Sequence, residues 1–310
     1  MIGNNTGQGA CRNPAQRRIE LTGWGCIDSL SPQNAQAEKN RRLGMAKVNL
    51  GGVELAYEVH GQGDPLLLIG GFTMVKEAWA HQVAGLSKRL QVIAFDNRGV
   101  GESTVPQEPF SISDMAQDAI GLLDALGISC ANIFGISMGG LIAQVMALDH
   151  PERVRKLALG CTTHGGKEAV APAPQVMELM AKAADPSLSP EQAVRMRVPI
   201  LFGERFLQEE PQRVEDWVRM AVKYAPTPQG AALQMKALSR FNVRERLGEI
   251  RCPVLVITGS QDRMMHPENS RLLASRIQGA KLYMVEGAGH LFFQERPEEV
   301  NRVLMEFFLS

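Results

Sequence analysis

The chain has 310 residues, of which 45% are hydrophobic and 21% are charged. These proportions are ordinary for a globular protein and exclude a fibrous repeat or a chain that is disordered throughout. The 33 basic residues equal the 33 acidic ones, so net charge favours neither nucleic acid nor an anionic membrane as partner. We therefore expect a folded protein whose partner is a small molecule.

The first 44 residues are polar and basic, and they lack the continuous apolar stretch of a signal peptide. A regular alternating pattern begins only at Met45. We expect residues 1–44 to be a disordered leader or to lie upstream of the natural start, with a docked arm as the alternative. No run of about 18 apolar residues occurs, so the sequence predicts no transmembrane helix and a cytoplasmic location.

Short apolar runs alternate with helical patterns along most of the chain. Residues 47–60 alternate apolar and polar side chains around Gly51-Gly52, which predicts a β-hairpin. Uniformly apolar runs typical of strands buried on both faces follow at 65–71, 90–96, 131–136, 156–161, 253–259 and 280–287. Helical spacing between them predicts an α/β fold, a mostly parallel sheet flanked by helices.

Residues 167–246 break this alternation, because helical patterns follow one another there with no strand pattern between them. Prolines at 172–174, 186–190, 211 and 226–228 separate the predicted helices. We expect a helical cap over 167–246, inserted into a core formed by 45–166 and 247–310, with a separate helical domain as the alternative. The apolar cap residues expected to pack the helices or to line a pocket are Met177, Met180, Leu201, Phe202, Phe206 and Trp217.

Ser137 is the candidate nucleophile. It stands in the segment GISMG, directly after an apolar strand pattern and directly before a helical one. A serine at a sharp strand-to-helix turn is held in strained geometry with its hydroxyl exposed, and Gly135 and Gly139 let the backbone fold back. Since the bare GxSxG pattern arises by chance in roughly one chain of this length in ten, the strand-turn-helix context carries the prediction.

His290 is the candidate general base, because a serine hydroxyl needs a base to remove its proton. It ends the small-residue loop Gly287-Ala288-Gly289-His290, which follows the last predicted strand. His164 and His266 also lie on predicted loops and are the alternative bases. Structural roles are expected for the histidines in the hairpin and in helical patterns, His60, His81 and His150.

Asp262 is the candidate acid that fixes the tautomer of His290. It follows the apolar run PVLVITG, where the carboxyl end of a strand meets its loop. Active sites of open parallel sheets assemble at that edge. An aspartate that caps the next helix is the alternative, but the chain order Ser137, Asp262, His290 favours the catalytic role.

Two backbone N–H groups are candidates for stabilising an oxyanion. One belongs to Met138, the residue after the candidate nucleophile, and the other to Phe72, which follows Gly70-Gly71 at the end of a predicted strand. A plain turn is the alternative role of the two glycines.

Other chemistries are not indicated. The segment DNRGVGES (96–103) lacks the ending of a phosphate-binding loop and the spacing of a dinucleotide site, so we expect a structural loop. The cysteines show neither a CxxC pair nor metal-ligand spacing, so we expect reduced thiols and no metal site. We also expect no cofactor. Three of them lie beside apolar runs and are expected to be small buried residues, Cys130, Cys161 and Cys252.

Together these motifs resemble those of the α/β-hydrolase family over residues 45–310. The matching segments, in the order of the family, are LLLIGGF, DNRGVGES, GISMGG, ITGSQD and GAGH. The resemblance implies the α/β-hydrolase fold and a cap over 167–246 that roofs the pocket and selects substrates. One departure is Gly70-Gly71, where many relatives have His-Gly.

Within the family, the chain looks most similar to carboxylesterases and 3-oxoadipate enol-lactonases. Relatives that use an aspartate nucleophile are disfavoured, because position 137 is a serine. We expect a serine hydrolase that cleaves small carboxylic esters through an acyl-serine intermediate. The alternatives are an enol-lactonase, a carbon-carbon bond hydrolase, a cofactor-free perhydrolase and a non-catalytic small-molecule receptor.

Overall fold

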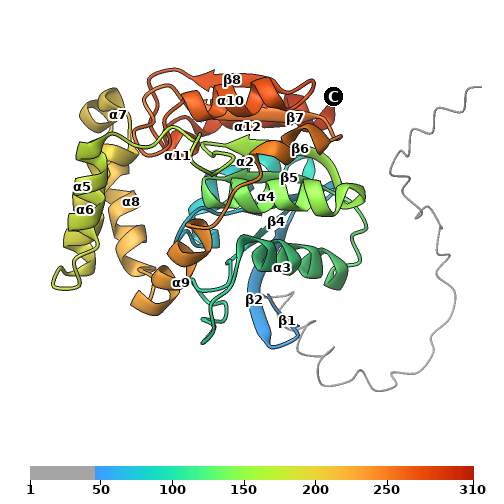
Figure 1. Ribbon diagram of the computed structural model, residues 1–310, viewed down its shortest axis with the longest axis horizontal. Coiled ribbons are helices and arrows are strands. Elements are labelled where there is room, and N and C mark those ends of the chain that lie inside the picture. Colours follow the sequence, from blue (N-terminus) through green and yellow to red (C-terminus); the bar gives the residue numbers. More distant parts are fainter. Residues whose placement is uncertain (1–45) are drawn as a thin grey trace, which may run out of the picture.

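The central element of the protein is an eight-stranded sheet with the strand order β1-β2-β4-β3-β5-β6-β7-β8 (Figure 1). The computed structural model describes residues 46–310, so the leader predicted over residues 1–44 lies outside the described residues. β2 pairs antiparallel with β1 and β4, and the other neighbouring strands are parallel. The strands are β1 (Ala46–Leu50), β2 (Val53–His60), β3 (Asp64–Ile69), β4 (Leu90–Phe95), β5 (Ala131–Ile136), β6 (Val154–Gly160), β7 (Val254–Gly259) and β8 (Lys281–Val285).

Helices connect the strands. Those before β6 are η1 (Lys76–Trp79), α2 (Ala80–Leu86), α3 (Ile112–Ala125), α4 (Met138–Asp149) and η2 (Pro151–Arg153). Those between β6 and β7 are α5 (Pro174–Ala183), α6 (Pro190–Leu201), α7 (Glu204–Glu209), α8 (Pro211–Lys223), α9 (Pro228–Leu238) and η3 (Arg244–Glu249). Those after β7 are α10 (Glu268–Arg276), α11 (Phe292–Glu295) and α12 (Pro297–Leu309). None of the helices within residues 46–310 has the length and apolar composition to cross a bilayer.

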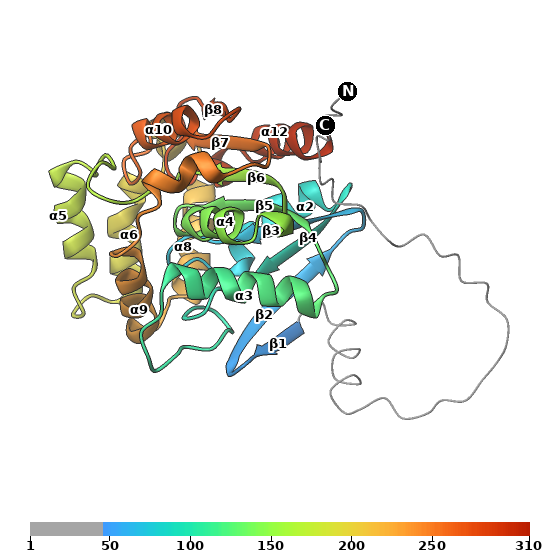
Figure 2. The ribbon, with the colours of Figure 1, turned by 45° about the vertical axis from the view of Figure 1, so that its right-hand side comes forward.

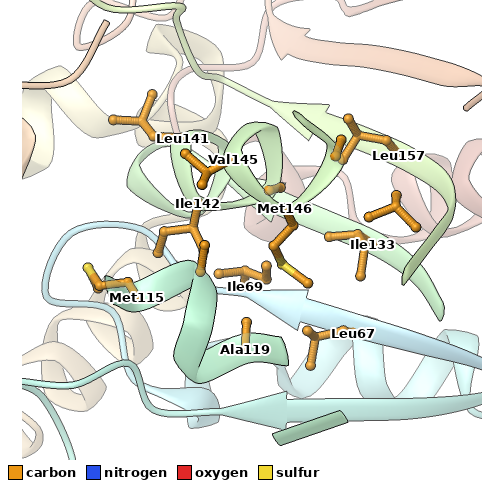
Figure 3. Close-up of a cluster of buried hydrophobic side chains, with 14 of the residues drawn as sticks. Leu67, Ile69, Met115, Ala119, Ile133, Leu141, Ile142, Val145, Met146 and Leu157 are labelled. Atoms are coloured by element: carbon orange, nitrogen blue, oxygen red, sulfur yellow. The ribbon is translucent and has the colours of Figure 1, made fainter. Parts of the chain in front are cut away.

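Side chains of the parallel strands alternate between two buried layers, as strands covered on both faces require. On β3, Leu67 and Ile69 pack with residues of α3 and α4 (Figure 3), whereas Leu66 and Leu68 pack on the opposite face with residues of α2 and α12. Figure 2 shows α3 and α4 lying along one face of the central strands. The predicted α/β fold with helices on both faces of a mostly parallel sheet is therefore confirmed.

The helices between β6 and β7 are not one unit: α5, α6, α7 and α8 lie together at the left of Figure 1, here called the α5–α8 group, whereas Leu247 of η3 belongs to the main core. Four helices of this segment, α5, α6, α8 and α9, begin with a proline, whose missing N–H costs nothing in the first turn of a helix. An isolated antiparallel bridge joins Gly165 to Asn242 near the two ends of the segment. The small core of α6, α7 and α8 consists of Val194, Phe202, Phe206, Val214 and Val218.

The loop after β4 supports the loop after β3. The buried carboxylate of Asp96 accepts hydrogen bonds from the backbone N–H groups of Lys76 at 2.7 Å and Glu102 at 3.0 Å. The side chain of Asn97, also buried, donates to the carbonyl oxygen of Gly70 at 3.0 Å. The segment DNRGVGES therefore positions backbone beside Phe72, which agrees with the structural role expected for it.

We predict that Asp96→Ala lowers the free energy of unfolding by about 2–5 kcal/mol, because two backbone N–H groups lose their acceptor. Urea unfolding followed by circular dichroism measures the change. The matched control is Asp216→Ala, which breaks an exposed ion pair with Arg219 and should cost less than about 1 kcal/mol. Equal effects of the two substitutions would contradict the supporting role of Asp96.

Candidate active site

The predicted site residues follow four parallel strands at one edge of the sheet. Phe72 lies in the loop after β3, Ser137 follows β5, Asp262 follows β7 and His290 follows β8. The carboxyl ends of parallel strands meet at such an edge, so loops far apart in the chain come together there. Phe72, Ser137 and His290 line a single cavity that is also lined by residues of the α5–α8 group.

Ser137 occupies a tight turn between β5 and α4. Its φ of 50° and ψ of −119° lie in a region that L residues rarely adopt, so the turn holds the serine in a strained conformation. A Cβ atom at Gly135 would lie 2.2 Å from the carbonyl oxygen of Gly139, and one at Gly139 would lie 2.1 Å from that of Ile69. The turn can therefore form only with glycine at these two positions.

His290 and Asp262 form a buried hydrogen-bonded pair. The Nδ1 atom of His290 lies 2.8 Å from Oδ2 of Asp262. The other carboxylate oxygen accepts the backbone N–H groups of Met264 at 2.9 Å and Met265 at 2.8 Å, so the carboxylate is held in place by its own loop. Asp262 does not cap α10, whose N-cap is Pro267. Because Nδ1 of His290 is bonded to Asp262, Nε2 is the nitrogen that can accept a proton from Ser137.

The environment of His290 changes its acidity. Burial lowers the pKa of His290, but the charge of Asp262 and its hydrogen bond outweigh burial, so this pKa lies well above the ordinary histidine value. The imidazolium form is therefore stabilised, which suits a group that must hold a proton during a reaction.

The alternative bases lie elsewhere. His164 is buried with Nδ1 2.7 Å from the carbonyl oxygen of Gly165, and His266 accepts the backbone N–H of Glu268 at 3.2 Å. Neither lines the cavity that Ser137 lines. Among the three histidines considered as bases, His290 alone borders that cavity.

Among the backbone N–H groups of Phe72, Thr73 and Met138, those of Phe72 and Met138 are available as donors to an oxyanion. Met138 is the first residue of α4, so its N–H has no acceptor within the helix. Within residues 46–310, the N–H of Phe72 has no acceptor either. The N–H of Thr73, in contrast, donates to Oε1 of Gln234 at 2.9 Å. Gln234 on α9 thus occupies the N–H of Thr73, a contact that its place in the sequence does not indicate.

Cys161 is buried as expected, but it is not merely a small apolar residue. It follows β6 with a φ of 38°, and its thiol lies beside the side chains of His290 and Asp262. Burial raises the pKa of this thiol, so it stays protonated at neutral pH. The candidate ligand atoms of Cys161, Asp262 and His290 lie within 4.8 Å of one another, so these residues could hold a metal ion. Such an ion would compete with the hydrogen bond between His290 and Asp262.

A buried glutamate joins the histidine loop to the α5–α8 group. Oε1 of Glu295 accepts the N–H of Gly289 at 2.8 Å and the N–H of Gly203 at 3.1 Å. Burial raises the pKa of Glu295, and the two N–H groups oppose this effect by stabilising the charged form. Sequence patterns gave no signal for Glu295, because its partners lie 6 and 92 residues away in the chain.

Some apolar residues of the α5–α8 group line the cavity, and others pack the helices against one another. Met180, Leu201 and Trp217 line the cavity, and Trp217 also meets the ring of Phe202 edge-on at 5.3 Å. Phe202 and Phe206 belong to the small core of the group, whereas Met177 is 54% exposed. The cavity is therefore bounded by core loops on one side and by these helices on the other.

Comparisons with known proteins agree with this architecture. A family model described as the alpha/beta hydrolase fold matches residues 64–297. The chain is 32% identical to a protein of Azorhizobium caulinodans named "Putative carbamate hydrolase RutD", over 83% of this chain and 96% of that protein.

Two solved structures are also similar. The enol-lactonase from Burkholderia xenovorans superposes with a TM-score of 0.75 at 28% identity, covering 86% of this chain and 100% of that one. A thermophilic esterase from Thermogutta terrifontis gives a TM-score of 0.74 at 28% identity, covering 85% and 97%. The chain therefore belongs to the α/β-hydrolase family and is a hydrolase of that fold.

Proposed function

We propose that the protein is a serine carboxylesterase that cleaves small carboxylic esters through an acyl-Ser137 intermediate. The observation that carries the proposal is that Ser137 and His290 line one cavity while Nδ1 of His290 is bonded to Asp262 at 2.8 Å. The proposal includes the division into a core of residues 45–166 and 247–310 and a cap of residues 167–246 that roofs the cavity.

In the first half-reaction, Nε2 of His290 accepts the proton of the Ser137 hydroxyl as the oxygen attacks the ester carbonyl. The N–H groups of Phe72 and Met138 stabilise the negative oxygen of the tetrahedral intermediate, which is worth several kcal/mol in a water-poor site. His290 then gives its proton to the departing alcohol. Asp262 keeps the imidazole oriented and stabilises its charged form.

In the second half-reaction, a water molecule takes the place of the alcohol. His290 removes a proton from this water as the oxygen attacks the acyl-serine carbonyl. The second tetrahedral intermediate collapses, the proton returns to Ser137, and the carboxylic acid leaves. The same groups act in both halves, so no cofactor is needed for the chemistry to balance.

A lactonase is the second candidate. The structural likeness to the enol-lactonase from Burkholderia xenovorans favours it over a carbon-carbon bond hydrolase or a receptor. A lactone is an internal ester, so the acyl-serine step is unchanged except that the released alkoxide stays attached to the acyl group. A panel of open-chain esters and lactones assayed on the purified protein separates the two candidates by their kcat/KM values.

We predict that Ser137→Ala lowers kcat/KM for a short-chain aryl ester by at least about 10³-fold, because it removes the nucleophile. A fluorophosphonate probe should label the unmodified protein and not the variant. The control is Ser275→Ala, which changes an exposed serine on α10 and should leave both measurements unchanged. Turnover by Ser137→Ala close to that of the unmodified protein would contradict the proposal.

The raised pKa of His290 predicts a pH profile. The base must be neutral to accept a proton, so kcat/KM should rise with pH, with its midpoint above the ordinary histidine value of about 6.5. Asp262→Asn removes the charge that opposes burial, so it should move the midpoint to lower pH and reduce kcat. A profile that is flat between about pH 5 and 9 would argue against His290 as the base.

A further inference from the structure

Arg197, on α6, borders the cavity that Ser137 and His290 line. Its Nε donates to the carbonyl oxygen of Ala193, one turn earlier on the same helix, at 3.0 Å. Within residues 46–310, no carboxylate forms an ion pair with its guanidinium, and its two terminal nitrogens have no acceptor. A guanidinium does not lose its proton in proteins, so a fixed cation without a counter-charge faces the cavity.

Two other half-buried arginines, Arg98 and Arg213, have acceptors on other elements. Arg98 makes two hydrogen bonds to the carboxylate of Asp118, at 2.5 and 2.7 Å. Arg213 donates to the backbone carbonyl oxygen of Gln294 at 2.5 Å. Withdrawal of a charge from water without a partner is costly, and at Arg197 only the hydrogen bond from Nε to Ala193 offsets this cost. Burial is also the single influence on the pKa of Arg197, which it lowers.

The cavity that Arg197 borders is otherwise lined mainly by apolar and uncharged residues. Apart from Arg197 and His290, the described residues that line the cavity include no charged side chain. The helices contribute mainly apolar groups to it, among them Met180, Leu201, Trp217 and Met220. A ligand that complements this lining has an apolar body and one anionic group. The planar guanidinium with two free terminal nitrogens matches a carboxylate, which can accept both N–H groups side by side.

We propose that Arg197 binds a free carboxylate of the substrate, so that the enzyme prefers esters or lactones whose acyl portion carries this second group. The inference rests on the proposed ester hydrolysis at Ser137. Ser137 follows β5 and Arg197 lies on α6, so the reacting carbonyl and the carboxylate bind to different walls of the cavity. An aliphatic or cyclic spacer then lies against the apolar lining between them.

Hydrolysis of two isosteric esters tests the preference. Monomethyl adipate differs from methyl hexanoate only in carrying a carboxylate in place of the terminal methyl group. The unmodified protein should show a kcat/KM at least about 10-fold higher for monomethyl adipate, the effect of one charged hydrogen-bonded pair. Arg197→Met should reduce this ratio to near or below one, and Arg197→Lys should retain part of it, because lysine keeps the charge without the planar fork.

The matched control is Arg195→Met on the same helix. Arg195 is exposed and pairs with Glu191 at 2.8 Å and Glu215 at 2.7 Å, so its replacement should leave the ratio of the two esters unchanged. Circular dichroism checks that each variant is folded. Equal kcat/KM values for the two esters in the unmodified protein, or an unchanged ratio in Arg197→Met, would overturn the inference while leaving the esterase proposal intact.

A binding measurement makes the test independent of turnover. Isothermal titration calorimetry of the Ser137→Ala protein with hexanoate and with the neutral hexanamide should show hexanoate binding at least about 10-fold more tightly. The double variant Ser137→Ala/Arg197→Met should lose this difference. The difference in affinity between hexanoate and hexanamide can depend on Arg197 even if the unmodified protein hydrolyses neither ester. That result would support the carboxylate site and contradict the proposed function. A difference that persists without Arg197 would overturn the site.

Discussion

The hydrogen bond between His290 and Asp262 is the interaction on which the rest of the site depends. It joins the loops after β7 and β8, and it engages Nδ1 so that Nε2 is the nitrogen left for Ser137. It also sets the acidity of the imidazole, because the charge of Asp262 opposes the effect of burial. The thiol of Cys161 completes this buried group from the end of β6. Three neighbouring strands thus contribute to one small polar cluster at the edge of an otherwise apolar core.

The loops around the cluster are held by polar side chains that also reach the helices between β6 and β7. Glu295 binds the N–H of Gly289 beside His290 and the N–H of Gly203 between α6 and α7. Gln234 on α9 binds the N–H of Thr73 in the loop after β3. These helices are therefore attached directly to two of the loops that border the cavity. A displacement of the helices would disturb the candidate oxyanion donors and the histidine loop together, so the shape of the cavity and the geometry of the proposed chemistry are coupled.

Charged and apolar side chains are distributed unevenly over the lining of the cavity. Its base carries the candidate reacting groups, and its helical wall carries one cation among apolar side chains. An apolar compartment favours hydrocarbon but gives little discrimination between chains of similar size, whereas an unpaired Arg197 discriminates by charge. Because the cation belongs to α6 and the candidate nucleophile to the turn after β5, the proposed recognition and the proposed chemistry reside on different parts of the chain.

The sequence by itself determined the order of strands and helices, because hydrophobic periodicity is a local property and each apolar run or amphipathic segment lies within a few neighbouring residues. It also indicated Ser137, Asp262 and His290, because a glycine-flanked turn and the ends of buried strands leave local patterns, and the structure brings these three residues to one edge of the sheet. Only the tertiary structure decided the parts played by Cys161, Gln234, Glu295 and Arg197. Cys161, Gln234 and Glu295 contact residues that only folding brings near them, whereas Arg197 lacks an ion-pair partner in the folded structure. Neither condition produces a pattern along the chain.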